Sequence, residues 1–122
     1  MTKILVIEDD KPILDNLVDM LTMEDFDVIY ADNGLEGINL AIAEIPDLIL
    51  CDIMMPEFDG YYVLNSLRSN GITKDIPFMF LTAKADIVFV RQGIQMGANQ
   101  YLTKPFTRNE LLKSIKQLII NN

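Results

Sequence analysis

The first apolar run of the chain reads Ile4-Leu5-Val6-Ile7, and three acids, Glu8-Asp9-Asp10, follow it directly. The run is too short for a helix, and its apolar residues do not alternate with polar ones, so it is typical of a strand buried on both faces. Two further runs have the same character, Leu48-Ile49-Leu50-Cys51 and Phe78-Met79-Phe80-Leu81. Residues 26–31 and 100–103 are weaker candidates. The sequence therefore predicts five strands.

Stretches with a helical spacing of apolar residues separate the predicted strands. The apolar positions of these five stretches are Ile13, Leu14, Leu17, Val18 and Leu21; Leu35, Ile38, Ala41, Ile42 and Ile45; Leu64 and Leu67; Ile87, Val90 and Ile94; and Leu111, Leu112, Ile115, Leu118 and Ile119. Strands that alternate with helices predict an α/β fold, a doubly wound parallel sheet with helices on both faces. Ligands of such folds bind beyond the carboxyl ends of the strands.

The length and the charge of the chain narrow the classes of function. Its 122 residues, half of them hydrophobic, predict one globular domain that spans residues 1–122. Residues 1–60 hold 15 acids and 2 bases, a net of −13, whereas residues 61–122 hold 3 acids and 8 bases, a net of +5. Because nucleic acid binding depends on a basic face, the acidic first half argues against nucleic acid as a ligand of this domain. A positively charged ligand fits better.

The sequence shows no sign of export or of a membrane. Its single cysteine, Cys51, cannot form an internal disulfide, so nothing points to an oxidising compartment. The first apolar run is interrupted by Glu8 and is far too short for a signal peptide. No apolar run approaches the roughly 18 residues of a membrane span. We therefore expect a cytoplasmic protein that has no membrane partner.

Polar residues follow the predicted strands at the edge where a ligand would bind. They are Glu8, Asp9 and Asp10 after the first strand, Asp52 after the third, Thr82 and Ala83 after the fourth, and Lys104-Pro105 after the fifth. Carboxylates that converge on one edge repel one another unless a cation lies among them. Oxygen ligands of this kind suit Mg²⁺, which leaves coordination positions for water and phosphate oxygens. The pattern predicts a magnesium site, with a lysine that balances the charge.

Short motifs occur in order at these strand ends. They are the acids at 8–10, Asp52-Ile53-Met54-Met55-Pro56 with Asp59-Gly60, Thr82-Ala83, Gly97-Ala98, and Tyr101 three residues before Lys104-Pro105-Phe106. Together they resemble the receiver domain of bacterial two-component response regulators, in particular the chemotaxis regulators. The resemblance spans the whole chain. It implies a flavodoxin-like (βα)5 fold with five parallel strands in the order 2-1-3-4-5.

The resemblance also implies a function. A receiver takes a phosphoryl group from a phosphohistidine of a sensor histidine kinase or phosphotransfer protein, and Asp52 matches the phosphoacceptor. By the family pattern Asp9 and Asp52 bind Mg²⁺ directly, Glu8 binds it through water, and the backbone carbonyl of Met54 is a further ligand. Mn²⁺ is expected to substitute for Mg²⁺. The domain is expected to be no enzyme, beyond assisting its own phosphorylation and dephosphorylation.

Other residues match the positions that respond to the phosphoryl group. Lys104 pairs with Asp52 at rest and with the phosphoryl group afterward, while Thr82 and the backbone N–H of Ala83 bind phosphoryl oxygens. In the family Thr82 then moves toward the phosphoryl group, and Tyr101 turns inward. This switch changes the face of the fourth helix, fifth strand and fifth helix, which controls a downstream effector or an output domain. The bond between Lys104 and Pro105 matches the family's cis peptide.

Three residues have interpretations outside this site. Asp10 precedes Pro12 at an early helical position and is expected to cap the first helix rather than to bind the metal. Val88 and Phe89 lie away from the core face that the spacing assigns to the fourth helix. We expect this pair to contribute to a partner or dimer surface.

Two other functions share this type of fold or this type of nucleophile. A flavodoxin-like electron carrier needs hydroxyl and glycine donors for a phosphate after its first strand, and Glu8-Asp9-Asp10 would repel that phosphate. A phosphatase of the haloacid dehalogenase type has a second aspartate two residues after the nucleophile, where this chain has Met54. Neither alternative accounts for the whole set of residues. The sequence leaves open whether the receiver acts alone or with an output domain.

Overall fold

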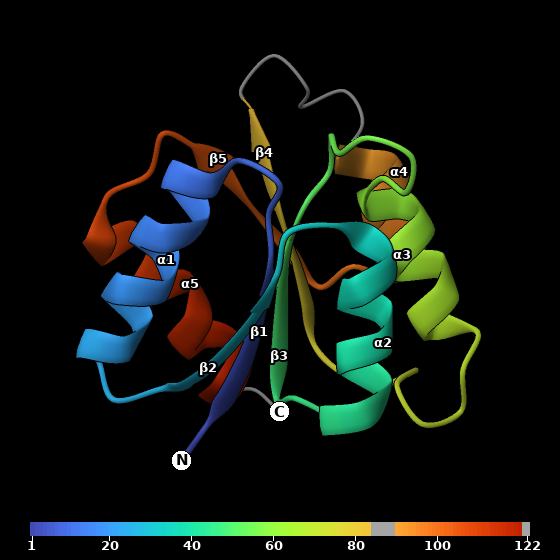
Figure 1. The fold of residues 1–122 in the computed structure, drawn as a ribbon, viewed down its shortest axis with the longest axis horizontal. Coiled ribbons are helices and arrows are strands. Elements are labelled where there is room, and N and C mark those ends of the chain that lie inside the picture. The colour runs from blue at the N-terminus through green and yellow to red at the C-terminus, as the bar shows by residue number, and fades with distance from the viewer. Residues whose placement is uncertain (84–89, 121–122) are drawn as a thin grey trace.

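The computed structural model describes residues 1–83 and 90–120, in which strands and helices alternate along the chain (Figure 1). The elements are β1 (Lys3–Ile7), α1 (Lys11–Met23), β2 (Asp27–Ala31), α2 (Gly34–Glu44), β3 (Leu48–Asp52), α3 (Gly60–Arg68), β4 (Phe78–Ala83), α4 (Val90–Gln95), β5 (Gln100–Lys104) and α5 (Arg108–Ile120). Each predicted strand and helix is found near its predicted position.

All five strands belong to one parallel sheet in the order β2-β1-β3-β4-β5, which confirms the predicted fold class and strand order. The register brings the carboxyl ends of the central strands to one edge. Ile7 of β1 pairs with Cys51 of β3, and Asp52 pairs with Leu81 of β4. Between β4 and β5, Ala83 pairs with Lys104. The residues that follow the strands are therefore neighbours in space.

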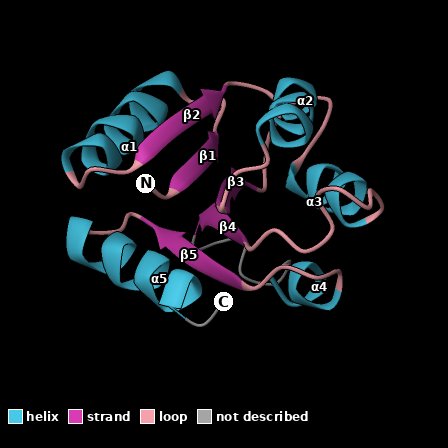
Figure 2. Ribbon diagram, turned by 90° about the horizontal axis from the view of Figure 1, so that it is seen from below, coloured by secondary structure: helices cyan, strands magenta, loops and turns pink. Residues whose placement is uncertain are grey.

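Helices cover the sheet on both faces (Figure 2). Helices α1 and α5 lie on one face, and α2, α3 and α4 lie on the other. Alternate residues of β1 serve the two layers, since Ile4 and Val6 pack toward α1 and α5, whereas Leu5 and Ile7 pack toward α2 and α3. This explains why the strand sequences are apolar without alternation: both faces of the sheet are buried.

The helical spacing of the sequence wrongly assigned three apolar residues to the core. Leu35, Ile45 and Ile94 are 49%, 56% and 42% exposed. Glycines take the buried positions instead, and because they have no side chain they carry no hydrophobic signal. In α4 Gly93 is buried, and an added Cβ there would lie 2.2 Å from a ring carbon of Phe80.

The second helix shows the same effect. An added Cβ at Gly34 would lie 2.5 Å from the carbonyl oxygen of Phe58, and one at Gly37 would lie 2.5 Å from Ile7. The core face of α2 therefore begins at these glycines, and Ile45 lies beyond the helix as its left-handed C-cap, with φ 47°.

Asp10 caps α1 as predicted, since its carboxylate accepts a hydrogen bond from the backbone N–H of Ile13, with Pro12 in the first turn.

Val88 and Phe89 lie outside the described residues, so the partner or dimer surface expected of this pair stays a prediction. Among helices of the described ranges, none is long and apolar enough to cross a membrane.

Candidate functional site

Three carboxylates meet where β1 and β3 end. Glu8 and Asp9 follow β1 directly, and Asp52 is the last residue of β3. One carboxylate oxygen from each of the three lies within 4.8 Å of the others. Glu8 is fully buried, Asp52 is nearly so, and Asp9 is exposed at the rim. The structure thus brings together the acids that the sequence placed at one edge, with one of them open to an incoming ion.

Lys104 enters this cluster from the end of β5. Its Nζ lies 2.7 Å from Oε1 of Glu8 and 3.3 Å from Oδ2 of Asp52. The predicted pairing of Lys104 with Asp52 is present, but the shorter contact joins Lys104 to Glu8. One ammonium group therefore neutralises part of the charge of two buried carboxylates.

The cluster shifts the protonation of its members. Burial raises the pKa of the Glu8 carboxyl above its ordinary value, and the neighbouring Asp52 raises it further, while Lys104 opposes both. Burial and the adjacent Glu8 also raise the pKa of Asp9. Burial alone would lower the pKa of Lys104, but its hydrogen bond to Glu8 and the charge of Asp52 outweigh burial, and this pKa is raised. Two acids with raised pKa values indicate a site short of positive charge.

The end of β4 borders the same cluster. Thr82 is almost fully buried, and its hydroxyl donates a hydrogen bond of 3.2 Å to the carbonyl of Ala83. Because Leu81 pairs with Asp52 in the sheet, Thr82 lies one residue beyond the level of that carboxylate. Thr82 and Ala83 therefore lie at the end of the strand next to β3. Tyr101 lies further along the sheet on β5 and is 39% exposed.

The loop after β3 folds closely over the end of the strand. The backbone N–H of Gly60 donates to the carbonyl of Ile53 at 2.8 Å, and an added Cβ at Gly60 would lie 2.5 Å from the carbonyl oxygen of Asp52. Glycine is needed for this approach. Asp59 caps α3 by accepting from the N–H of Tyr62 at 2.9 Å. Met54, in the loop, is 59% exposed.

Family comparison agrees with this geometry. The sequence model described as "Response regulator receiver domain" matches residues 4–116. The chain belongs to the response regulator receiver family. This membership accounts for the order of the motifs, and the fold of the family is the one observed.

Relatives of the receiver include transcriptional regulators. The chain is 42% identical over 119 residues to the "DNA-binding dual master transcriptional regulator RpaA" of Synechocystis, covering 98% of this chain and 49% of RpaA. It is 40% identical over 117 residues to the "Transcriptional regulatory protein CusR" of Escherichia coli, covering 96% of this chain and 51% of CusR. The chain therefore spans about half the length of these relatives.

Solved structures of receivers superpose closely on this one. The chemotaxis protein CheY4 of Vibrio cholerae has a TM-score of 0.91 at 27% identity, covering 97% of this chain and 98% of CheY4. The receiver domain of sensor histidine kinase PA1611 from Pseudomonas aeruginosa has a TM-score of 0.89 at 30% identity, covering 97% of both chains. That structure is described with a magnesium ion coordinated in its active site cleft.

One residue with contacts between distant segments was not singled out by the sequence. Arg68, the last residue of α3, donates hydrogen bonds to the carbonyls of Ile76 and Gly97, just before β4 and β5. An arginine at a helix end gives no sequence signal for such a role.

The Lys104–Pro105 peptide bond is cis, as the resemblance implied.

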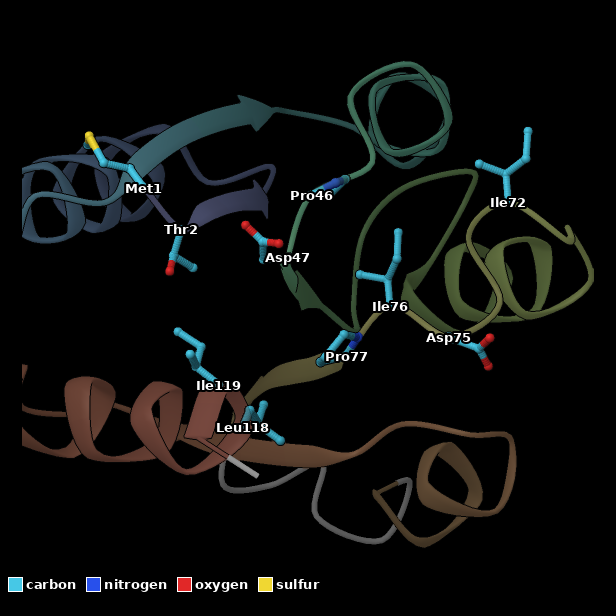
Figure 3. A pocket seen from close by; sticks show the side chains of 10 residues that line it. All are labelled: Met1, Thr2, Pro46, Asp47, Ile72, Asp75, Ile76, Pro77, Leu118 and Ile119. Carbon is cyan, nitrogen blue, oxygen red and sulfur yellow. The ribbon is translucent and has the colours of Figure 1, made fainter. Parts of the chain in front are cut away.

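A cavity of about 630 Å³ lies at the opposite edge of the sheet, near the amino ends of the strands (Figure 3). Asp47, Ile76 and Pro77 contribute to it from the loops that enter β3 and β4, and Ile72 lies at its rim. None of the residues that line it belongs to the carboxylate cluster. This cavity is therefore separate from the receiver site.

Proposed function

We propose that Asp52 accepts a phosphoryl group from a phosphohistidine of a sensor histidine kinase or phosphotransfer protein. The observation that carries the proposal is the meeting of three carboxylates with Lys104 at one edge of the sheet. A carboxylate oxygen of Asp52 attacks phosphorus, the bond between phosphorus and the imidazole nitrogen breaks, and the nitrogen keeps the electron pair. The product is an acyl phosphate, the type of covalent intermediate that an aspartate forms in some ATPases.

The donor set fits Mg²⁺. All its side-chain donors are oxygens, and one or two carboxylates plus waters are typical of protein-bound Mg²⁺. In this proposal Asp9 and Asp52 bind the ion directly, the carbonyl of Met54 adds a ligand, and Glu8 acts through water. The contact of Glu8 with Lys104 supports an outer role for Glu8. The bound ion supplies charge neutralisation for the phosphoryl oxygens, and Mn²⁺, a similar hard cation, is proposed to replace it.

The remaining residues hold the phosphoryl group. Lys104 shifts its contact from the carboxylates to a phosphoryl oxygen, and Thr82 and the backbone N–H of Ala83 donate to others. Positioning and charge neutralisation of this kind account for most of the catalysis of phosphoryl transfer. The hydroxyl of Thr82 donates to a neighbouring carbonyl in the present state, so its rotation toward the new group is a local change. With Tyr101 it would bias the face of α4, β5 and α5.

The signalling role follows from this switch. Residues 1–122 act as one receiver, whose changed face controls a downstream effector or an output domain. A relative, RpaA, is described as a DNA-binding transcriptional regulator. The receiver itself binds neither nucleic acid nor membrane, and it acts in the cytoplasm. It turns over no substrate other than its own phosphoryl group and is not an enzyme.

Incubation with acetyl phosphate tests the proposal. The wild-type chain is expected to gain the mass of one phosphoryl group in the presence of Mg²⁺ and none in the presence of a chelator. Asp52→Asn should gain none. Asp59→Asn, which changes another acid in the same loop, is the matched control and should still be labelled. Labelling of Asp52→Asn at the wild-type rate would overturn the assignment.

A further inference from the structure

A pocket of about 310 Å³ opens beside the carboxylate cluster, between the loop that enters α2 and the loop that enters α3. It is lined by Asp9, Asp32, Asn33, Leu35, Met55, Pro56, Glu57 and Phe58. We call it the Leu35 pocket. Asp9 belongs both to this pocket and to the carboxylate cluster. Anything that delivers a phosphoryl group to Asp52 therefore passes close to its mouth.

The walls of the Leu35 pocket are held by local hydrogen bonds. Asn33 caps α2 by accepting from the N–H of Glu36 at 2.9 Å, and its amide donates to Asp32 at 2.9 Å. On the other side Glu57 adopts a left-handed conformation, with φ 65°, and Phe58 donates its N–H to Pro56 at 2.7 Å. A pocket formed in advance binds without a cost for ordering its walls.

The pocket also has an apolar surface that the fold does not use. Leu35 is 49% exposed at its edge, although it lies in an amphipathic helix. The ring centroid of Phe58 lies 4.8 Å from that of Tyr62, a neighbour outside the lining that is itself 49% exposed. Exposed apolar residues that gather at one hollow are typical of an interaction surface.

The charge around the pocket has one sign. Among the residues that the structure describes, the ionisable side chains that line it are Asp9, Asp32 and Glu57, all of them acids. An acidic rim around an apolar hollow complements an apolar side chain flanked by lysine or arginine. It does not suit a free acyl phosphate or a nucleotide, whose charge is negative.

We infer that the protein that delivers the phosphoryl group docks here, with an apolar side chain in the Leu35 pocket and basic residues against Asp32 and Glu57. This inference rests on the proposed function. It adds a specificity site: the pocket selects the phosphohistidine protein, while small phosphodonors reach Asp52 without it.

The test compares two donors of the same phosphoryl group. One is acetyl phosphate. The other is the histidine kinase that labels the wild-type chain fastest among the purified, autophosphorylated kinases of the organism that encodes it. Leu35→Ser is expected to raise the KM for this kinase about tenfold, the loss expected when an apolar contact of this size is removed, with kcat unchanged. Its labelling by acetyl phosphate should equal that of the wild type.

Ile72→Ser is the matched control. Like Leu35, Ile72 is an exposed aliphatic side chain, at 57%, but it lies at the opposite edge of the sheet (Figure 3). Labelling by either donor should therefore match that of the wild type. Leu35→Met, which keeps an apolar side chain of similar size, should have the KM of the wild type. Asp32→Asn combined with Glu57→Gln should flatten the dependence of kcat/KM on salt concentration, because rim charges act mainly on association.

The other outcomes overturn either the inference or the proposed function on which it rests. Equal KM values for Leu35→Ser and Ile72→Ser would show that the kinase does not use the pocket. Loss of labelling by both donors in Leu35→Ser would show that Leu35 supports the site itself. A wild-type chain that acetyl phosphate labels but no kinase does would contradict the proposed partner class. A wild-type chain that neither donor labels would instead refute the proposed function.

Discussion

The guanidinium of Arg68 joins the end of α3 to the amino ends of two strands. Its Nη1 donates to the carbonyl of Ile76 at 2.8 Å, and its Nε and Nη2 donate to the carbonyl of Gly97 at 3.1 and 2.9 Å. Nη2 also lies 3.2 Å from Oδ1 of Asn99, which accepts from the N–H of Phe78. Arg68→Met keeps much of the apolar stem and removes all of these donors.

The expected loss of stability follows from the acceptors. Two backbone carbonyls lose a charged donor, and a hydrogen bond to a charged group contributes about 1.5–3 kcal/mol. Because Arg68 is only partly buried, the lower value applies to each carbonyl, so we expect Arg68→Met to lower the free energy of unfolding by about 3 kcal/mol. For a domain of this length this corresponds to a fall in Tm of about 9–15 °C.

Urea unfolding followed by circular dichroism measures this change. Arg91→Met, at an exposed arginine of α4, is the control and should stay within about 0.5 kcal/mol of the wild type. A loss below about 1 kcal/mol for Arg68→Met would refute the reasoning, because the two carbonyls would then be satisfied without the guanidinium.

Three further predictions concern the stability of the receiver. Gly93→Ala should cost about 1–3 kcal/mol in urea unfolding, because its Cβ would lie 2.2 Å from the ring of Phe80, whereas an unchanged stability would place α4 elsewhere. Asp10→Ala should cost about 1 kcal/mol through the lost cap of α1, and Asp10→Asn should retain most of it. Without Mg²⁺, the pKa of Glu8 is higher in the folded state than in the unfolded state, where it is about 4.3. Protonated Glu8 therefore stabilises the fold at a pH below about 4.3, and this stabilisation is lost as the pH rises through the pKa of the folded state. The stability of the wild type relative to Glu8→Gln should therefore fall as the pH rises from 4 to 7, and a rise would contradict the assigned desolvation.

The fold was predictable because its signals are local. A run such as Ile4-Leu5-Val6-Ile7 is apolar at every position, and this alone indicates a strand buried on both faces. The carboxyl ends of parallel strands share an edge, so the meeting of Glu8, Asp9 and Asp52 followed from the strand assignment.

The parts that sequence missed depend on contacts between distant segments. Helical periodicity is read from apolar side chains, so it assigned Ile94 to the core. In the structure Ile94 is exposed, and the neighbouring Gly93 packs against the ring of Phe80 in the sheet. The contacts of Arg68 join residues 29 positions apart, and nothing near it in the chain indicates them. The sequence also could not show that Lys104 lies closer to Glu8 than to Asp52. The two acids carry the same charge, so only the folded distances show which of them makes the shorter contact.

The position of the phosphoryl group tests the central claim most directly. After labelling with acetyl phosphate and Mg²⁺, reduction of the acyl phosphate with borohydride marks the modified carboxyl, and peptide mass spectrometry locates it. We predict a single modified residue, Asp52. Modification of Asp9, Asp59 or another acid in its place, or no modified carboxyl at all, would contradict the account.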